Sequence, residues 1–170
     1  MPEASHTLMV QAPLGVVWEF VREMGKWARL VPGFQHFVPI DERQSRWTVK
    51  GNLGVVSRTV EFCVDITEWV ECSQVAFRLR ALNENATGRG ALHAAKDTDS
   101  STTLKFQLSL EAGGTMGPMV NALMGPVLPR LVIEFARAIG EEIERTYRES
   151  GVDVATPPQS SRSSTRRETS

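Results

Sequence analysis

The chain has 170 residues, of which 41% are apolar and 23% charged, and its formal net charge is -1. This length is enough for one domain with a sizeable core, and the balanced charge excludes a whole-protein field that would attract nucleic acid or an anionic membrane. The N-terminal residues MPEASHTLMV lack the basic start and apolar stretch of a signal peptide, so we expect a cytoplasmic protein.

The N-terminal region predicts one strand followed by two short helices. Residues 5–11 alternate in polarity, which is typical of an edge strand. Pro13 then favours a helix start, because proline is tolerated in a first helical turn. Apolar side chains around Trp18 give this helix a face to bury. A second short helix around Trp27 should end at the Pro-Gly pair at 32–33.

The middle of the chain predicts an antiparallel meander. Apolar and polar side chains alternate through most of it, and short polar turns separate the alternating runs. The expected strands are residues 34–40, 46–52, 55–66, 75–80, 85–95 and 104–111. Together with the first strand they make one sheet of about seven strands.

The segment 116–143 predicts a long helix that is apolar on nearly every side as far as Ile139. A surface helix usually shows an apolar stripe over only about a third of its circumference. This helix must therefore be covered on more than one side, by the sheet, a ligand, a partner or a membrane. Its charged residues and prolines make it a poor membrane span. Pro126 and Pro129 should kink or divide it, and it should end near Ser150.

We therefore expect an α+β protein with one domain over residues 1–150. A curved antiparallel sheet would wrap around the long C-terminal helix, with two short helices after the first strand. Residues 151–170 have almost no apolar side chains and predict a disordered polar tail. Arginines in this tail would each add only roughly 1 kcal/mol of attraction to an anionic membrane. We expect at most peripheral membrane contact.

Several short motifs sharpen this interpretation. They are Ala-Pro at 12–13, Val-Trp at 17–18, Leu-Val-Pro-Gly at 30–33, the hairpin Gly-Asn-Leu-Gly at 51–54 and the strand Gly-Arg-Gly-Ala at 88–91. With the order of elements, they resemble the START-like (SRPBCC) helix-grip superfamily, which includes birch pollen allergen and polyketide cyclases. Within it they are most similar to CoxG, a subunit of carbon monoxide dehydrogenase, and its relatives. The resemblance covers residues 5–148.

The resemblance implies a cavity between sheet and long helix that holds an apolar molecule. For CoxG proteins it also implies a role with a molybdenum-dependent dehydrogenase, as membrane recruiter or quinone carrier. Many of those relatives have an apolar C-terminal anchor, whereas the tail of this chain is polar and short. Other branches of the superfamily are cyclases, hydrolases or lipid binders, and a shared fold does not select among them.

The candidate ligand-binding residues are apolar side chains of the long helix and of the strands that would face it. They are Trp47, Val60, Phe62, Phe77, Phe106 and Leu108 on strands, and Met116, Met119, Leu123, Val127, Leu131 and Phe135 on the helix. Methionine and aromatic side chains adapt well to apolar guests. Leu123, Val127 and Leu131 are four residues apart, so they share one side of the helix. Ordinary core packing is the alternative interpretation of the same residues.

Two polar residues complete the candidate site. Arg58 shares a face with Val60 and Phe62, where its guanidinium could bind a carbonyl or carboxylate through paired donors. The alternative, which we favour, is that Arg58 lies at the strand's end and reaches water. His93 could donate a proton, although a surface or hydrogen-bonded histidine is commoner. The sequence shows no nucleophile motif, metal-ligand spacing or nucleotide fingerprint, so we expect no metal and no cofactor.

The leading hypothesis is a protein that binds an apolar or amphipathic small molecule, such as a quinone, lipid or polyketide-like compound. Such a protein could serve a redox enzyme complex. The first alternative is an enzyme of the same fold, a cyclase or dehydratase. It would need a titratable group within hydrogen-bond reach of its substrate. The second alternative is a protein–protein adaptor whose own side chains fill the cavity.

Overall fold

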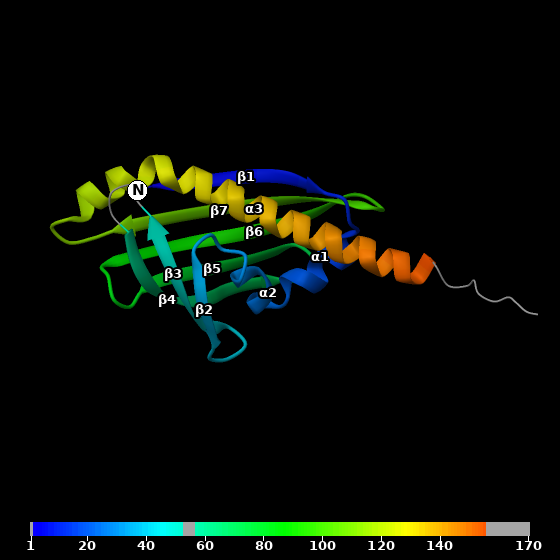
Figure 1. Cartoon of the computed structure of the whole chain (residues 1–170), viewed down its shortest axis with the longest axis horizontal. Helices are drawn as coiled ribbons and strands as arrows, with labels where there is room; N and C mark the ends of the chain where they lie inside the picture. The colour runs from blue at the N-terminus through cyan, green and yellow to red at the C-terminus, as the bar shows by residue number, and fades with distance from the viewer. Residues whose placement is uncertain (1, 53–56, 156–170) are drawn as a thin grey trace, which may run out of the picture.

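One antiparallel sheet and three helices make up the part of the chain that the structure describes (Figure 1). This structure is a computed structural model, and it describes residues 2–52 and 57–155. In chain order the elements are β1 Glu3–Val10, α1 Leu14–Val21, α2 Met24–Ala28, β2 Phe34–Pro39, β3 Gln44–Asn52, β4 Ser57–Val70, β5 Gln74–Ala81, β6 Ala86–Thr98, β7 Ser101–Ala112 and α3 Gly117–Ala155.

The sheet has seven strands in the order β1-β7-β6-β5-β4-β3-β2. Strands β2 to β7 form a meander in which each strand pairs with the next. β1 pairs with β7 and is therefore one edge of the sheet, and β2 is the other. All three helices lie on one face of the sheet, and α3 crosses that face beside β1 and β7 (Figure 1). This arrangement confirms the α+β helix-grip fold that the sequence predicts.

The two faces of the sheet differ as the sequence alternation predicts. In β5, Val75, Phe77 and Leu79 are buried on the inner face, while Arg78 and Arg80 are exposed on the outer face. The inner-face residues of neighbouring strands pair directly, so that one apolar surface runs across the strands. The helices cover this surface, and the core lies between them and the sheet.

One stripe of α3 is buried against the sheet. It consists of Leu128, Val132, Ala136, Ile139 and Ile143, spaced three or four residues apart as one side of a helix requires. A β-carbon at Gly140 would lie 2.8 Å from Cδ1 of Leu8 on β1. The missing side chain at this position therefore lets α3 lie close to β1.

α3 differs in two respects from the expectation. It is one helix across Pro126 and Pro129, so these prolines do not divide it. It also runs to Ala155, beyond the expected end near Ser150, and thus into the segment expected to be a polar tail. Residues 156–170, the remainder of that expected tail, lie outside the described residues.

Gly90 on β6 makes room for an aromatic side chain of the neighbouring strand. A β-carbon at Gly90 would lie 2.5 Å from Cζ of Phe77, which is its cross-strand partner. Phe77 itself is buried and lies 5.8 Å from Trp27 of α2, measured between ring centroids. Gly90 therefore leaves room for the Phe77 ring, which also packs against Trp27.

We predict that Gly90→Ala destabilises the protein by about 1–3 kcal/mol, the usual cost of inserting bulk into a packed core. Chemical denaturation measures this free energy of unfolding. Gly15→Ala is the matched control, because a β-carbon at Gly15 would meet nothing within 4 Å. Phe77→Leu should relieve part of the loss in the Gly90→Ala background. Equal effects at Gly90 and Gly15 would contradict the steric explanation.

Candidate ligand-binding site

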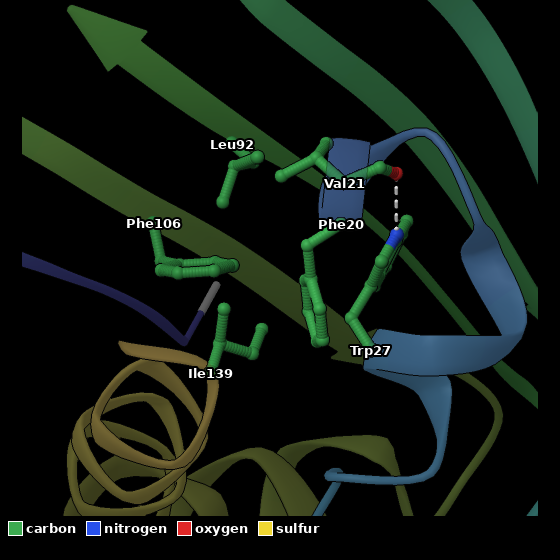
Figure 2. Close-up of a pocket in the computed structure, with 6 residues that line it drawn as sticks. All are labelled: Phe20, Val21, Trp27, Leu92, Phe106 and Ile139. Atoms are coloured by element: carbon green, nitrogen blue, oxygen red, sulfur yellow. Dashed lines mark hydrogen bonds between the residues drawn. The ribbon is translucent and has the colours of Figure 1, made fainter. Parts of the chain in front are cut away.

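A small apolar cavity lies between the helices and the sheet. Its volume is about 10 Å³, and it is lined by Phe20, Val21, Trp27, Leu92, Phe106 and Ile139 (Figure 2). These side chains come from α1, α2, β6, β7 and α3, and they point toward one another. Such a space is about that of one water, whereas small-molecule sites usually have roughly 300–1,000 Å³. At this place the side chains of the core therefore leave no room for an organic ligand.

An aromatic cluster fills the space under the short helices. Trp27 lies 5.4 Å from Trp47 and 5.8 Å from Phe77, and Phe106 lies 5.4 Å from Phe135, measured between ring centroids. Trp47, Phe77 and Phe106 are all buried, so the structure brings these three predicted site residues together as core. Phe106 also lines the small cavity.

The other predicted apolar residues are less buried. Phe62, Leu108 and Phe135 are half-buried and pack against the core. Val60, Leu123, Val127 and Leu131 are half-buried but lie outside that core cluster. Met116 and Met119 are exposed, with 56% and 52% of their surface accessible. The side of α3 chosen from the sequence is thus not the buried one.

Leu123, Val127 and Leu131 do not form the buried stripe because the helix is apolar on several sides. The stripe that meets the sheet is displaced by one residue and begins at Leu128. Apolar periodicity identifies the buried side of a helix only where the opposite side is polar. The first half of α3 has no polar side opposite its apolar one. The sequence pattern alone therefore could not show which side is buried, since that depends on where β1 lies.

The N-terminal segment of α3, residues 117–127, has a single buried residue, Gly117. By length and composition α3 from Gly117 to Ser150 could cross a membrane, and only 17% of its most apolar stretch is buried. The segment therefore presents apolar side chains that the rest of the described chain does not cover.

The side chain of Asn121 joins the N-terminal segment to the sheet. Its Oδ1 accepts a hydrogen bond from the backbone N–H of Ala112 at 2.8 Å, and its Nδ2 donates to the Ala112 carbonyl at 3.2 Å. Pro126 and Pro129 follow, and neither has an N–H to donate within the helix. The segment thus ends where the helix has lost two of its own hydrogen bonds.

Arg58 and His93 do not face the interior. Nε and Nη2 of Arg58 donate to Oε2 of Glu84 at 2.9 and 2.5 Å, and 57% of the Arg58 side chain is exposed. Arg58 thus behaves as the strand-end alternative describes. His93 stands opposite Gln74 and Lys105 on the outer face, which agrees with the surface alternative rather than with a proton donor in the pocket.

His6 is a titratable residue on the inner face that the sequence interpretation missed. It stands opposite Phe106 in the register of β1 and β7, and it is half-buried. The alternation of β1 places it on the same side as Leu8 and Val10. That alternation was visible in the sequence and could have identified it.

The buried polar side chains of the described residues are hydroxyls and indoles. Ser45 accepts from Nε1 of Trp47 at 2.6 Å, and Nε1 of Trp27 donates to the Val21 carbonyl at 2.9 Å. Nε1 of Trp18 is buried without a hydrogen-bond partner among the described residues. The interior is accordingly apolar, with a few hydrogen-bonded polar groups and one indole N–H, that of Trp18, without a partner among the described residues.

Charged groups with shifted pKa values lie at the surface. The indole N–H of Trp69, at 3.3 Å, and the guanidinium of Arg22, at 2.5 Å, lower the pKa of the Glu71 carboxyl. The neighbouring carboxylate of Glu142 raises the pKa of Arg145. Both shifted groups are exposed, so they belong to surface ion pairs rather than to the interior.

This geometry defines the class of protein. A seven-stranded antiparallel sheet that carries a long C-terminal helix on one face is the helix-grip fold of the START-like superfamily. The family model for CoxG, a subunit of carbon monoxide dehydrogenase, matches residues 7–144. The chain belongs to this family. No curated protein matches the sequence significantly.

Solved structures share the fold at low sequence identity. A conserved protein from Geobacillus kaustophilus has a TM-score of 0.71 and 15% identity, covering 85% of this chain and 96% of its own. The Zhui aromatase/cyclase from a Streptomyces species has a TM-score of 0.66 and 18% identity, covering 88% and 97%. A START superfamily protein from Mycobacterium smegmatis has a TM-score of 0.64 and 19% identity. The match covers 85% of this chain and 98% of that protein.

Leu123 and Leu128 offer a matched test of which side of α3 supports the fold. Leu128 is 2% exposed, so Leu128→Ala should reduce the free energy of unfolding by about 2–5 kcal/mol. Leu123 is only half-buried, so Leu123→Ala should cost less than about 1 kcal/mol. Urea denaturation of the two variants measures both values. A larger loss at Leu123 would show that the N-terminal segment is packed as core.

Proposed function

We propose that the protein binds an apolar or amphipathic small molecule, such as a quinone, lipid or polyketide-like compound, between the sheet and the N-terminal segment of α3. The observation that supports this is the contrast along α3. Its second half is buried in the core, whereas Leu123 and Val127 of the N-terminal segment are half-buried and outside it. A guest in this region would complete the burial of these side chains.

The energetics favour such a guest. Full burial of a leucine, valine or methionine contributes up to about 1.5–3 kcal/mol relative to exposure. Half-buried side chains have realised only part of that gain. On the sheet, Phe62 and Leu108 are also half-buried and face inward. A flat apolar molecule in contact with the side chains of the helix segment and with those of the sheet would remove apolar surface from water on both of its sides.

A guest larger than a water does not fit the cavity described above, whose volume is about 10 Å³, so we expect part of the structure to move on binding. The N-terminal segment of α3 is the part suited to move. At one end the two hydrogen bonds of Asn121 connect the segment to Ala112. At the other end the two prolines remove hydrogen bonds from the helix, so the segment can bend away from the rest of α3 there. The rest of α3 would stay on the sheet through its buried stripe.

Membership of the CoxG family supports a finer proposal about the partner. We infer that the bound molecule serves a cytoplasmic redox enzyme of the carbon monoxide dehydrogenase type, for which this protein would be an accessory subunit. An enzyme of the aromatase/cyclase kind is the alternative, because one structural relative has that name. In that case His6 would be the inward-facing group to supply acid–base chemistry.

We predict that Leu123→Glu weakens binding of a neutral apolar dye, such as Nile red, by at least about tenfold, since an apolar site disfavours a charge. Fluorescence titration of the full chain measures the affinity. Ala122→Glu is the matched control, because it adds the same charge at the next position, which is exposed. The control should bind the dye like the wild type.

The outcomes separate the alternatives. Equal binding by all three proteins would show that the site lies elsewhere. A wild type that binds no dye, and that carries no compound in a native mass spectrum after purification from its own host, would overturn the binding proposal in favour of the adaptor. Loss of turnover of a cyclisable substrate in His6→Gln would instead favour the enzyme.

A further inference from the structure

The outer face of the sheet, opposite the helices, contains a groove of about 750 Å³. It crosses the strands from β1 through β7, β6 and β5 to β4. The small side chains of Ala76 and Ala91, which are direct cross-strand partners, form its floor. Gln107 on β7 stands next to Ala91. The groove is therefore long and shallow, and no helix of the described chain covers it.

Two arginines stand together on one side of this groove. Arg78 on β5 and Arg89 on β6 are direct cross-strand partners, and both are exposed. Neither forms an ion pair with a carboxylate of the described residues, whereas Arg22, Arg58 and Arg145 do. Like charges directly opposite each other on a sheet are destabilising. An anionic group bound between them would relieve this repulsion.

Other charged residues of the outer face surround the Arg78–Arg89 pair. Arg80 and Arg46 lie one row away, on either side of Cys63, and both are exposed. Four carboxylates are near. Asp65 stands opposite Arg78 and Glu68 opposite Ala76 on β4, Glu3 lies at the β1 end of the groove, and Glu111 on β7 shares a row with Arg80. The positive charge is thus concentrated over β5 and β6, between acidic residues at the β4 and β1 ends.

We propose that this groove binds an extended acidic segment of a partner protein. Five strands at about 4.8 Å spacing make a path of roughly 20 Å, which matches about six residues of extended peptide. Guanidinium groups bind carboxylates through paired donors, so Arg78 and Arg89 would hold aspartate or glutamate side chains. Gln107 supplies an amide for the peptide backbone. This surface is on the opposite face from the ligand site, so the proposal does not rest on the proposed function.

The probe for the test is a fluorescein-labelled peptide of about eight alternating glutamates and aspartates, long enough to span the groove. Fluorescence anisotropy with the full chain should show saturable binding that weakens as salt is added. A peptide of glutamine and asparagine of the same length should not bind. Arg78→Gln with Arg89→Gln should weaken binding of the acidic peptide by at least about tenfold.

Two further variants make the test specific. Arg137→Gln with Arg148→Gln removes the same charge from exposed positions of α3 and should change the affinity by less than about twofold. Ala91→Trp fills the groove without changing the charge and should also weaken binding at least about tenfold. Circular dichroism and thermal melting confirm that each variant is folded.

Several results would overturn the proposal. They are an absence of peptide binding by the wild type, unchanged affinity in the Arg78/Arg89 variant, and an equal loss in the α3 control. Binding of polyphosphate, or of vesicles containing phosphatidylserine, without binding of the peptide would assign the arginines to a phosphate ligand or a membrane instead. An Ala91→Trp variant that is folded and binds normally would show that the groove itself is not used.

Discussion

The close approach of α3 to β1 at Gly140 is the constraint on which the rest of the structure depends. A β-carbon at this position would lie 2.8 Å from Cδ1 of Leu8, so any side chain there would force Leu8 to move or the helix to shift. One turn later the backbone N–H of Gln11, just after β1, donates to Oε2 of Glu144 at 2.8 Å. These contacts hold the second half of α3 at a distance that lets its buried stripe meet β1 and β7. The packed core around Ile139 follows from that distance.

The same constraint divides the molecule into surfaces of different chemistry. The inner face is apolar, and α3 covers it unevenly, tightly at Ile139 and loosely at Leu123. The outer face is polar, and the two arginines at its centre pair with no carboxylate of the described residues. Because side chains alternate between the two faces of each strand, one set of strands supports both surfaces without conflict. A small-molecule site and a protein-binding site can therefore lie on opposite faces of this sheet.

The sequence predicted the strands and the order of elements because apolar and polar residues alternate within most strands. It did not predict which side of α3 is buried, since that helix is apolar on several sides. It also did not reveal the arginine pair. Alternation places Arg78 on the outer face, but only the register between β5 and β6 brings Arg89 opposite it. Register depends on turn geometry and on the whole sheet, so single-strand patterns do not contain it.

The position of β1 has a consequence for how this chain folds. β1 is made before the other six strands, yet its sheet partner is β7, which is made last among them. The hydroxyl of Thr102 donates to the carbonyl of Ala12 across 90 residues of chain. Closing so large a loop costs entropy before any pairing is gained, and folds dominated by such distant contacts fold slowly. The first strand, with its apolar inner side, must remain unpaired until nearly all the rest of the domain has left the ribosome.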